Sequence, residues 1–426
     1  MIETVRNAWK IPELRKKLLY VALALVVYRI GHAIYVPYVD TAALANQFAA
    51  YSSTILGYFN ILAGGGLSQA SVFALGVYPY INSSIIMQLL QVAIPALERL
   101  AKDGGEEGRK KIAQITRYVT IGLSLIMGYS YYVMLRHYGV LTRTDFWSGF
   151  VIVITFVAGS SFVMWLGEQI TEKGVGNGVS LLIFIGIVSR GPTAAYSMLY
   201  SVINGTLAWW KALIILILFV VIIAFVVFIT NAERRIPVSY AKRVVGRKQY
   251  GGQSTFLPMK VNMAGVMPVI FASTITTVPA TIAAFFTPAE GSFWANFVNV
   301  FSQGKPLYII VYVLLIFGFS YFYSTIQFNP IEVANNLKNN GGFIPGFRPG
   351  RPTSDFIAKV LNKVTLMGAI FLAIIAALPQ IMSNFNGMGG LAVGGTSMLI
   401  MVGVALETVK AIENQMLMRH YKGFLE

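Results

Sequence analysis

The sequence predicts an all-α polytopic membrane protein, and three observations lead to this fold class. Hydrophobic residues make up 56% of the 426-residue chain and the mean hydropathy is +0.66, while charged residues make up only 12%, about half of the ~25% typical of soluble domains. Apolar runs of about twenty residues recur from one end of the chain to the other. Basic residues gather in every second loop between these runs.

Ten apolar runs are candidates for transmembrane helices, because each is long enough to cross ~30 Å of hydrocarbon at ~1.5 Å per residue. Their centres lie at about residues 27, 83, 125, 158, 188, 220, 275, 318, 374 and 401. The longest polar stretches, at about residues 231–262 and 329–363, are therefore expected to be loops rather than separate domains. The chain has no cysteine, so no disulfide framework is possible.

The placement of basic residues predicts the orientation of these helices. Of the 33 Lys and Arg residues, 27 lie near the two termini and in the loops after the second, fourth, sixth and eighth spans. Loops that carry an excess of Lys and Arg stay on the cytoplasmic side of a membrane. We therefore expect both termini to be cytoplasmic. The alternation also supports a count of ten, because losing one span would disrupt it.

Each half of the chain contains five spans, an odd number, so a second half built like the first would be inverted in the membrane. The expected halves are residues 1–204 and 205–426. The second span of each half is interrupted by glycine, proline and small polar residues: Gly76, Pro79, Asn82, Ser83, Ser84 and Gln88 in the first, and Gly265, Pro268, Ser273, Thr274, Thr276, Thr277 and Pro279 in the second. Matching interrupted spans indicate a pathway through the membrane. The alternative is that these helices are buried among others, where small residues allow close packing.

The residues missing from the spans restrict what could pass along such a pathway. Ion-coupled transporters carry ionisable side chains within their spans, whereas here only Arg29 and Glu407 are clear cases, each close enough to a span end to reach the interface. No catalytic, metal-binding or nucleotide-binding motif is evident, so we expect no cofactor and no use of ATP by the chain itself. A wide passive pathway fits best. A secondary transporter of a small solute and, more remotely, a membrane enzyme stay open as alternatives.

Two of the basic loops are long and contain residues that promote local structure. The loop at residues 231–262 interleaves basic with β-branched and aromatic residues around Gly251 and Gly252, which predicts a protruding hairpin. The loop at residues 329–363 contains GGFIPGFRPGRP, a segment stiffened by Pro and Gly that exposes Arg348 and Arg351. One interpretation is orientation charge plus attraction to anionic lipid, at ~1 kcal/mol per basic residue. The other is a docking surface for an acidic partner or RNA phosphates.

Four segments carry a resemblance to a known family. They are FALGVYPYINSSIIMQLLQ, WLGEQITEKGVGNGVSLLIFIGIV, AERRIPVSYAKRVVGRKQYGGQSTFLPMKVNMAGVMPVIFAS and NNGGFIPGFRPGRPT. Together they closely resemble the SecY/Sec61-alpha family of protein-translocation channels, and the resemblance extends from the N-terminus to the C-terminus. It implies two inverted halves around a central pore with a plug and a lateral gate. It also implies that unfolded secretory polypeptides cross the bacterial plasma membrane through the pore, while hydrophobic segments leave it sideways into lipid.

The resemblance implies that residues 55–72 form the plug, a short helix that closes the outer funnel of the pore. Glycine adopts backbone angles that other residues avoid, which would let the segment bend and move. The plug residues would be Ile61, Leu62, Gly64, Gly65, Gly66 and Leu67. An ordinary re-entrant or interfacial segment is the alternative.

The resemblance also assigns the neck of the pore and its lateral gate. The neck would be a ring of isoleucines that excludes ions by dewetting: Ile81, Ile85, Ile183, Ile187, Ile275 and Ile400. The gate would lie between the second and third spans on one side and the seventh and eighth on the other. Its small polar residues would be Ser83, Ser84, Gln88, Asn262 and Thr274. Hydrogen bonds between transmembrane helices contribute only ~0.6 kcal/mol on average, weak enough for such a gate to open.

The partners implied by the resemblance are the SecE and SecG subunits, the SecA ATPase, the ribosome through contacts with rRNA, signal sequences and unfolded preproteins, and anionic lipids. The basic loops would bind SecA and the ribosome through Arg243, Arg247, Lys248, Arg348 and Arg351, with Arg348 the most critical. These partners would supply the energy that the chain cannot draw from ATP itself.

Overall fold

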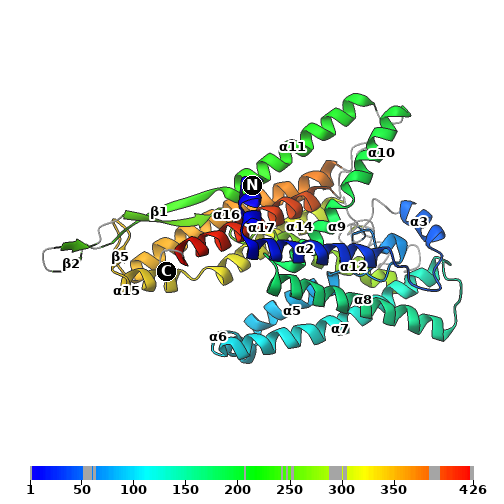
Figure 1. The fold of residues 1–426 in the computed structure, drawn as a ribbon, viewed down its shortest axis with the longest axis horizontal. Helices are drawn as coiled ribbons and strands as arrows, with labels where there is room; N and C mark the ends of the chain where they lie inside the picture. Colours follow the sequence, from blue (N-terminus) through cyan, green and yellow to red (C-terminus); the bar gives the residue numbers. More distant parts are fainter. Residues whose placement is uncertain are drawn as a thin grey trace. The chain divides into compact units, whose positions relative to one another are not determined.

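A computed structural model describes residues 2–50, 60, 64–205, 208–240, 243–245, 248–250, 254–286, 300, 305–382 and 394–422. Most of these residues are helical (Figure 1). The chain divides into two compact units. The first unit comprises Met1–Ile215, Thr277–Gln303 and Val404–Glu426, and the second comprises Leu216–Thr276 and Gly304–Gly403.

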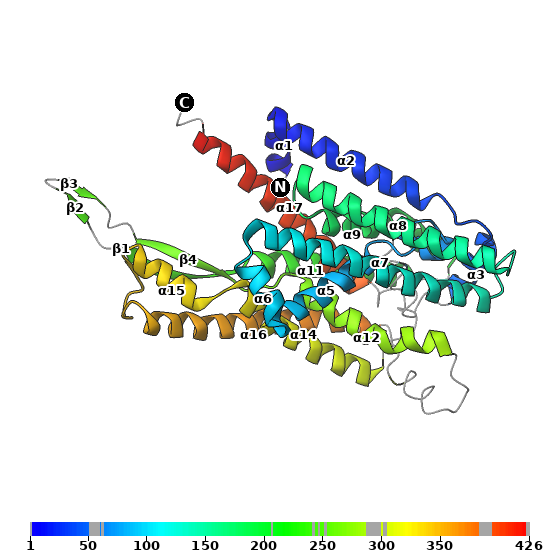
Figure 2. The same cartoon turned by 90° about the horizontal axis from the view of Figure 1, so that it is seen from below.

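The first unit is built from helices and one turn of 3-10 helix. These are α1 (Ile2–Lys10), α2 (Pro12–His32), α3 (Thr41–Ala50), η1 (Leu67–Gln69), α5 (Tyr78–Ala93), α6 (Pro95–Lys102), α7 (Gly105–His137), α8 (Phe146–Lys173), α9 (Gly178–Val188) and α10 (Gly191–Ile203). Helices α2, α5, α6 and α10 each have a proline in the first turn, where its missing N–H has no partner to lose. Helices α7 and α8 run side by side (Figures 1 and 2).

Helix α5 ends in a sharp bend. Tyr78–Ala93 and Pro95–Ala101 meet at 105°. Ile94, the residue between them, is extended with φ −110° and ψ 110°, because the ring of Pro95 disfavours helical geometry in the residue before it. The predicted second span therefore ends at Ala93, and α6 leaves it in a new direction.

The C-terminal part of α17 (Gly394–Lys422) packs with the N-terminal helices of the first unit. Ile412 is buried with Ala8 of α1 and Leu14 of α2. The hydroxyl of Thr4 donates to Glu413 Oε1 at 3.0 Å, and Lys17 Nζ donates to Gln415 Oε1 at 3.3 Å. The N-terminal helices and the end of α17 therefore lie together.

The second unit combines helices with short strands. Its helical parts are most of α11 (Trp209–Asn231), α12 (Met267–Phe286) as far as Thr276, α14 (Pro306–Gln327), α15 (Pro330–Asn339), α16 (Arg351–Met382) and the start of α17. Its strands are β1 (Glu233–Tyr240), β2 (Arg243–Val245), β3 (Lys248–Tyr250), β4 (Ser254–Lys260) and β5 (Gly342–Phe343). One antiparallel sheet has the order β4-β1-β5, with Ile236 opposite Leu257, and β2 pairs with β3.

The predicted spans agree with these helices. Within the described residues six helices are long and apolar enough to cross a membrane, or seven if the bent α5–α6 pair is one span. Each of the ten predicted centres falls within a helix, including those in α2, α12 and α17, which do not pass that test. The fold class of a helical polytopic membrane protein is confirmed, and the helices are consistent with ten spans.

Candidate functional site

The glycine-rich segment before α5 forms a tight turn that leads into η1. Gly64 and Gly65 have φ of +65° and +92°, in the left-handed region that glycine adopts without strain. The amide of Ser71 closes the turn by donating to the carbonyl oxygen of Gly66 at 3.0 Å. Four of the six predicted plug residues lie here, Gly64, Gly65, Gly66 and Leu67, and the other two, Ile61 and Leu62, lie outside the described residues.

Helices of the first unit form a seat for this turn. Leu67 is buried, and its carbonyl oxygen accepts a hydrogen bond from the hydroxyl of Tyr131 in α7. Ala70, which follows η1, is fully buried in the same apolar cluster. The cluster also includes Leu44, Leu135, Ile152 and Phe156. Both apolar contacts and a hydrogen bond therefore hold the segment against the helices of the first unit.

The residues after η1 pair with the chain that follows α2. The amide of Val72 donates to the carbonyl oxygen of Ile34 at 2.9 Å, and the amide of Val36 donates to that of Ala70 at 2.9 Å. Gly159 of α8 lies against this pairing, since a Cβ at position 159 would stand 2.0 Å from the carbonyl oxygen of Val72. Only glycine permits this approach, so α8 helps to fix the position of the segment.

Helix α5 carries the three polar residues predicted for one side of the gate. The hydroxyl of Ser83 is fully buried and donates to the carbonyl oxygen of Thr116 in α7 at 2.7 Å. The side-chain amide of Gln88 donates to the hydroxyl of Ser84, one turn earlier, at 3.2 Å. Ser83 therefore joins α5 to its neighbour within the first unit, while Ser84 and Gln88 interact along the helix.

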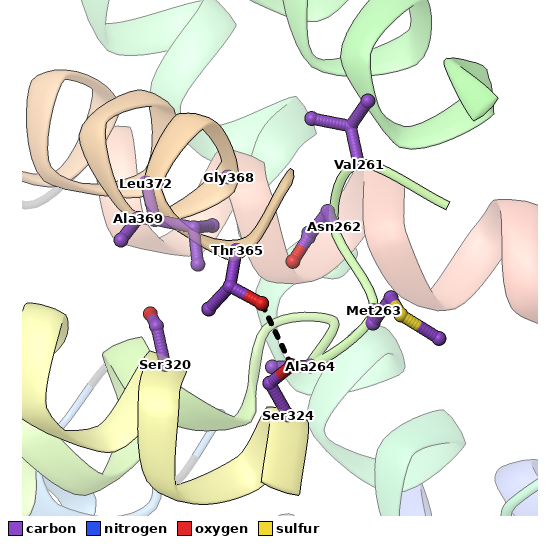
Figure 3. Close-up of a pocket in the computed structure, with 10 residues that line it drawn as sticks. All are labelled: Val261, Asn262, Met263, Ala264, Ser320, Ser324, Thr365, Gly368, Ala369 and Leu372. Atoms are coloured by element: carbon purple, nitrogen blue, oxygen red, sulfur yellow. Dashed lines mark hydrogen bonds between the residues drawn. The ribbon is translucent and has the colours of Figure 1, made fainter. Parts of the chain in front are cut away.

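Asn262 and Thr274, predicted for the other side of the gate, lie in the second unit and are at most 9% exposed. Asn262 lines a pocket with residues of the adjoining loop, α14 and α16 (Figure 3). The other lining residues are Val261, Met263, Ala264, Ser320, Ser324, Thr365, Gly368, Ala369 and Leu372. The hydroxyls of Ser324 and Thr365 are hydrogen-bonded at 2.7 Å and so join α14 to α16.

The pocket is small and partly polar. Its volume of about 10 Å³ is about the least that can hold one water molecule. The hydroxyl of Ser320 is buried and has no hydrogen-bond partner within the part of the chain that the structure describes. Such a group costs ~1–3 kcal/mol, which a water in the pocket would reduce. No cluster of His, Asp or Glu able to hold a metal ion occurs among the described residues.

The six predicted neck isoleucines are divided between the two units. In the first unit the members of each pair are one turn apart and share a helix face, Ile81 with Ile85 on α5 and Ile183 with Ile187 on α9. Ile275 of α12 and Ile400 of α17 belong to the second unit, and they are 37% and 1% exposed. The closure of one ring by all six stays a prediction.

The two basic loops of the second unit fold together into one structure, which we call the basic body. It consists of β1, β4, β5, α15 and the beginning of α16. Alternate residues of β1, Ile236 and Val238, point into an apolar core. The remaining buried members of that core are Met259, Ala334, Ile344, Ile357 and Leu361. The predicted hairpin is therefore present, and it is joined to the second loop.

Arg348 and Arg351 are exposed at the tip between β5 and α16. Phe347 stacks on Phe356 at a ring distance of 4.1 Å, and the carbonyl oxygen of Arg348 accepts a hydrogen bond from the Thr353 hydroxyl at 2.8 Å. These contacts fix the backbone that carries both arginines.

The β2–β3 hairpin lies beyond the end of the β1–β4 ladder (Figures 1 and 2). Two of the predicted docking residues occupy it, Arg243 on β2 and Lys248 on β3. A third, Arg247, lies outside the described residues. Positions 243 and 248 therefore lie on a hairpin that projects away from the helices of the second unit.

Comparison with known proteins identifies the family. The family model described as SecY matches residues 71–409. The chain is 43% identical over 442 residues to the protein translocase subunit SecY of Streptomyces galbus, covering 100% of each chain. It is 42% identical over 419 residues to that of Escherichia coli strain K12, covering 97% of this chain and 94% of the relative. The chain belongs to the SecY family.

Solved structures of SecY and Sec61 share the fold of this SecY-family chain. A study of the plug domain of a SecY protein provides one structure, with a TM-score of 0.68 at 19% identity over 96% of each chain. Sec61 from a canine ribosome–channel complex gives 0.63 at 17% identity, again over 96% of each chain. At these identities the likeness shows the fold alone, and it agrees with the predicted architecture.

Sequence reasoning missed how the basic loops of this SecY-family chain combine. The interleaving of basic with β-branched and aromatic residues predicted a hairpin, but no local signal predicted that β1 also pairs with β5, through Ser239 and Phe343. Sequence reasoning also missed the hydrogen bond between the hydroxyls of Ser324 and Thr365. A serine or threonine in a span is equally consistent with close helix packing, so its partner cannot be identified from the sequence.

Proposed function

We propose that this chain is the pore-forming subunit of a protein translocase, which conducts unfolded secretory polypeptides across the membrane and releases hydrophobic segments sideways into lipid. The observation that carries the proposal is the full-length identity of 43% to a protein translocase subunit. A structure described as a protein-conducting channel has the same fold, with a TM-score of 0.65 at 18% identity. The rival function, secondary transport of a small solute, rests only on the predicted inverted halves, residues 1–204 and 205–426.

The neck isoleucines and the plug would together keep the pore closed to ions. A ring of isoleucine side chains offers a passing polypeptide no hydrogen bonds, and an apolar constriction excludes ions by dewetting. Residues 55–72 would close the pore as a plug, and the seated turn at residues 64–67 supports this assignment. The related SecY structure is described as having a plug domain that stabilises the closed state of its channel and maintains a membrane seal.

The gate would sort polypeptide segments by their free energy of transfer into lipid. At the membrane centre a Leu contributes about −0.3 to −0.6 kcal/mol, whereas an Asp or Lys costs about 2.5 to 3.5 kcal/mol. One charge therefore offsets about six leucines. The gate residues Ser83, Ser84, Gln88, Asn262 and Thr274 would close the opening with weak polar contacts, so that an apolar segment can leave through it.

The proposed location is the bacterial plasma membrane, with both termini in the cytoplasm. The loop charges support this orientation. The contacts of Thr4 with Glu413 and of Lys17 with Gln415 also support it, because they bring the two ends of the chain together, as an even number of spans requires.

The basic body would be the cytoplasmic docking surface for the SecA ATPase and the ribosome, which supply the energy to a passive channel. Structures with the same fold include Sec61 in a ribosome–channel complex and an idle yeast Ssh1 complex bound to the 80S ribosome. SecE, SecG and anionic lipids complete the proposed set of partners.

Reconstitution tests the function. The chain, purified with SecE and SecG and placed in liposomes, should move a preprotein into the lumen only when SecA and ATP are present. Liposomes with SecE and SecG alone are the control. Accumulation of a small solute against its gradient without these partners, or the absence of preprotein transport when they are present, would overturn the proposal.

A further inference from the structure

Two arginines from different helices converge on the glycine turn. Arg29, in the last turn of α2, donates from Nη1 to the carbonyl oxygen of Gly64 at 3.3 Å. Arg190, the residue before α10, places its Nε and Nη2 atoms 3.3 Å from the position that a Cβ on Gly65 would take. Two guanidinium groups therefore lie against adjacent residues of one turn.

Neither arginine has a carboxylate partner within the described residues, where the ion pairs are Arg117–Glu168 and Arg235–Glu233. The sequence from residue 41 to residue 81 contains no Asp or Glu at all. The acceptor available to Arg29 in the structure is instead a backbone carbonyl of the turn. Hydrogen bonds in which the donor is charged are about twice as strong as neutral ones. The contact of Arg29 with Gly64 is therefore expected to stabilise the position of the turn.

The close packing around the turn explains why glycine occupies three positions in succession. A Cβ on Gly64 would stand 3.2 Å from the Cα of Gly186 and 3.3 Å from Nε2 of His32. A Cβ on Gly66 would stand 2.6 Å from the hydroxyl of Ser71. Side chains at these positions would separate the turn from the groups that contact it.

Tyr131 contacts the turn from a third helix. Its hydroxyl donates to the carbonyl oxygen of Leu67, at the other end of the same turn. Arg29, Tyr131 and Arg190 thus contact residues 64–67 from α2, α7 and the start of α10. Apolar packing tolerates small displacements, whereas hydrogen bonds depend steeply on distance and angle. The hydrogen bonds from Arg29 and Tyr131 would therefore be lost when the turn moves even slightly.

We propose that Arg29, Tyr131 and Arg190 form a latch, which holds the glycine turn in its seat and determines how often the plug leaves it. The inference rests on the proposed function, since it assigns the turn to a plug. All three are positioning residues: they hold the backbone of the turn. When the plug moves, these three side chains lose their contacts with the turn, and they regain them when it returns.

A single reporter thiol tests the latch. The chain has no cysteine, and Ser71, beside Gly66, is fully buried, so Ser71→Cys gives one thiol that is protected while the turn is seated. In proteoliposomes with SecE and SecG, the rate of reaction with a small thiol reagent measures how often the turn leaves its seat. Arg190→Gln and Arg29→Gln should each raise this rate about tenfold.

The conservative and control variants separate a latch from general destabilisation. Arg190→Lys should restore most of the slow rate, because it keeps the charge and a donor. Tyr131→Phe, which removes only the hydroxyl, should also raise the rate. Arg136→Gln is the matched control, because Arg136 is an exposed arginine at the end of α7, and it should leave the rate unchanged.

Unchanged labelling in Arg29→Gln, Arg190→Gln and Tyr131→Phe, or an equal rise in Arg136→Gln, overturns the latch. SecA-driven transport by the Ser71→Cys chain is measured in the same vesicles. Transport with unaltered labelling in the latch variants refutes the latch and leaves the proposed function standing. Faster labelling in those variants without any transport supports the contacts as a latch on this segment and refutes the translocase role.

Discussion

At the scale of single residues, the neck assignment depends on the physical properties of isoleucine. Its branched side chain is apolar and has few rotamers, so several of them can fill a constriction without offering a hydrogen bond. Ile85 and Ile183 are 4% exposed, as expected of residues that already pack within the first unit. Ile275 is 37% exposed, whereas its neighbours Thr274 and Thr276 are buried. The side chain of Ile275 therefore lies on the face of α12 that points away from the core of the second unit.

Replacing Ile81 or Ile275 with asparagine should increase ion conductance through the resting channel. An amide in the neck would hydrogen-bond water and so oppose dewetting. The same variants should transport preproteins with weak signal sequences more readily. Conductance across planar bilayers measures the first effect, and Ile81→Leu and Ile275→Leu, which stay apolar, are the controls. Conductance equal to that of the unmodified chain would contradict the neck assignment.

At the scale of elements, the basic body shows how long loops between spans can be made rigid. The register of β1 against β4 places Ile236 and Val238 on one face, where α15 and α16 cover them. Because the core is folded, Arg348 and Arg351 are held on a fixed tip rather than on flexible chain. A rigid basic surface loses less conformational entropy on docking than a flexible one, which favours a role in binding over orientation charge alone.

Two substitutions distinguish the surface of the basic body from its core. Arg348→Glu should reduce SecA-driven transport strongly while leaving the melting temperature of the purified complex unchanged, because the side chain is exposed. Ile357→Ala, at a residue with no exposed surface, should destabilise the body by about 2–5 kcal/mol and lower both transport and melting temperature. Full transport by Arg348→Glu would refute its docking role.

At the scale of the whole molecule, the distribution of charge predicts the orientation of the chain in the membrane. The two predicted cytoplasmic loops at residues 231–262 and 329–363 contain 12 of the 33 Lys and Arg residues. The loop between α7 and α8, which is predicted to lie outside, contains one Lys or Arg residue, Arg143, and a second, Arg136, lies at the end of α7 beside it. The predicted charge difference between the two sides of the membrane places both termini on the same side. The packing of the N-terminal helices with the end of α17 agrees with this.

Single cysteines should reveal this orientation, since the chain has none of its own. Thr144→Cys and Asn340→Cys both replace exposed residues, the first in the α7–α8 loop and the second after α15. A membrane-impermeant thiol reagent added to intact cells should label position 144 only, and after lysis it should label both. Labelling of position 340 in intact cells would invert the proposed topology.

The sequence by itself determined the helical spans and the family, and it predicts the orientation of the spans. All ten predicted centres fall in helices, from α2 to α17, because hydropathy acts along the chain and does not depend on which neighbour a helix acquires. The turn at Gly64 was also predicted, since glycine adopts left-handed backbone angles without strain. The bend of α5 at Ile94 was not predicted, although Pro95, which causes it, is visible in the sequence.

Only the tertiary structure decided which distant groups meet. Nothing local in the sequence connects Arg29 and Arg190 to the turn at residues 64–67, Ser83 to Thr116, or β1 to β5. These contacts arise from how helices and strands pack, and each side chain alone fits several surroundings equally well. The physical reason is that burial favours an apolar face in general, whereas a hydrogen bond requires one particular partner at one distance.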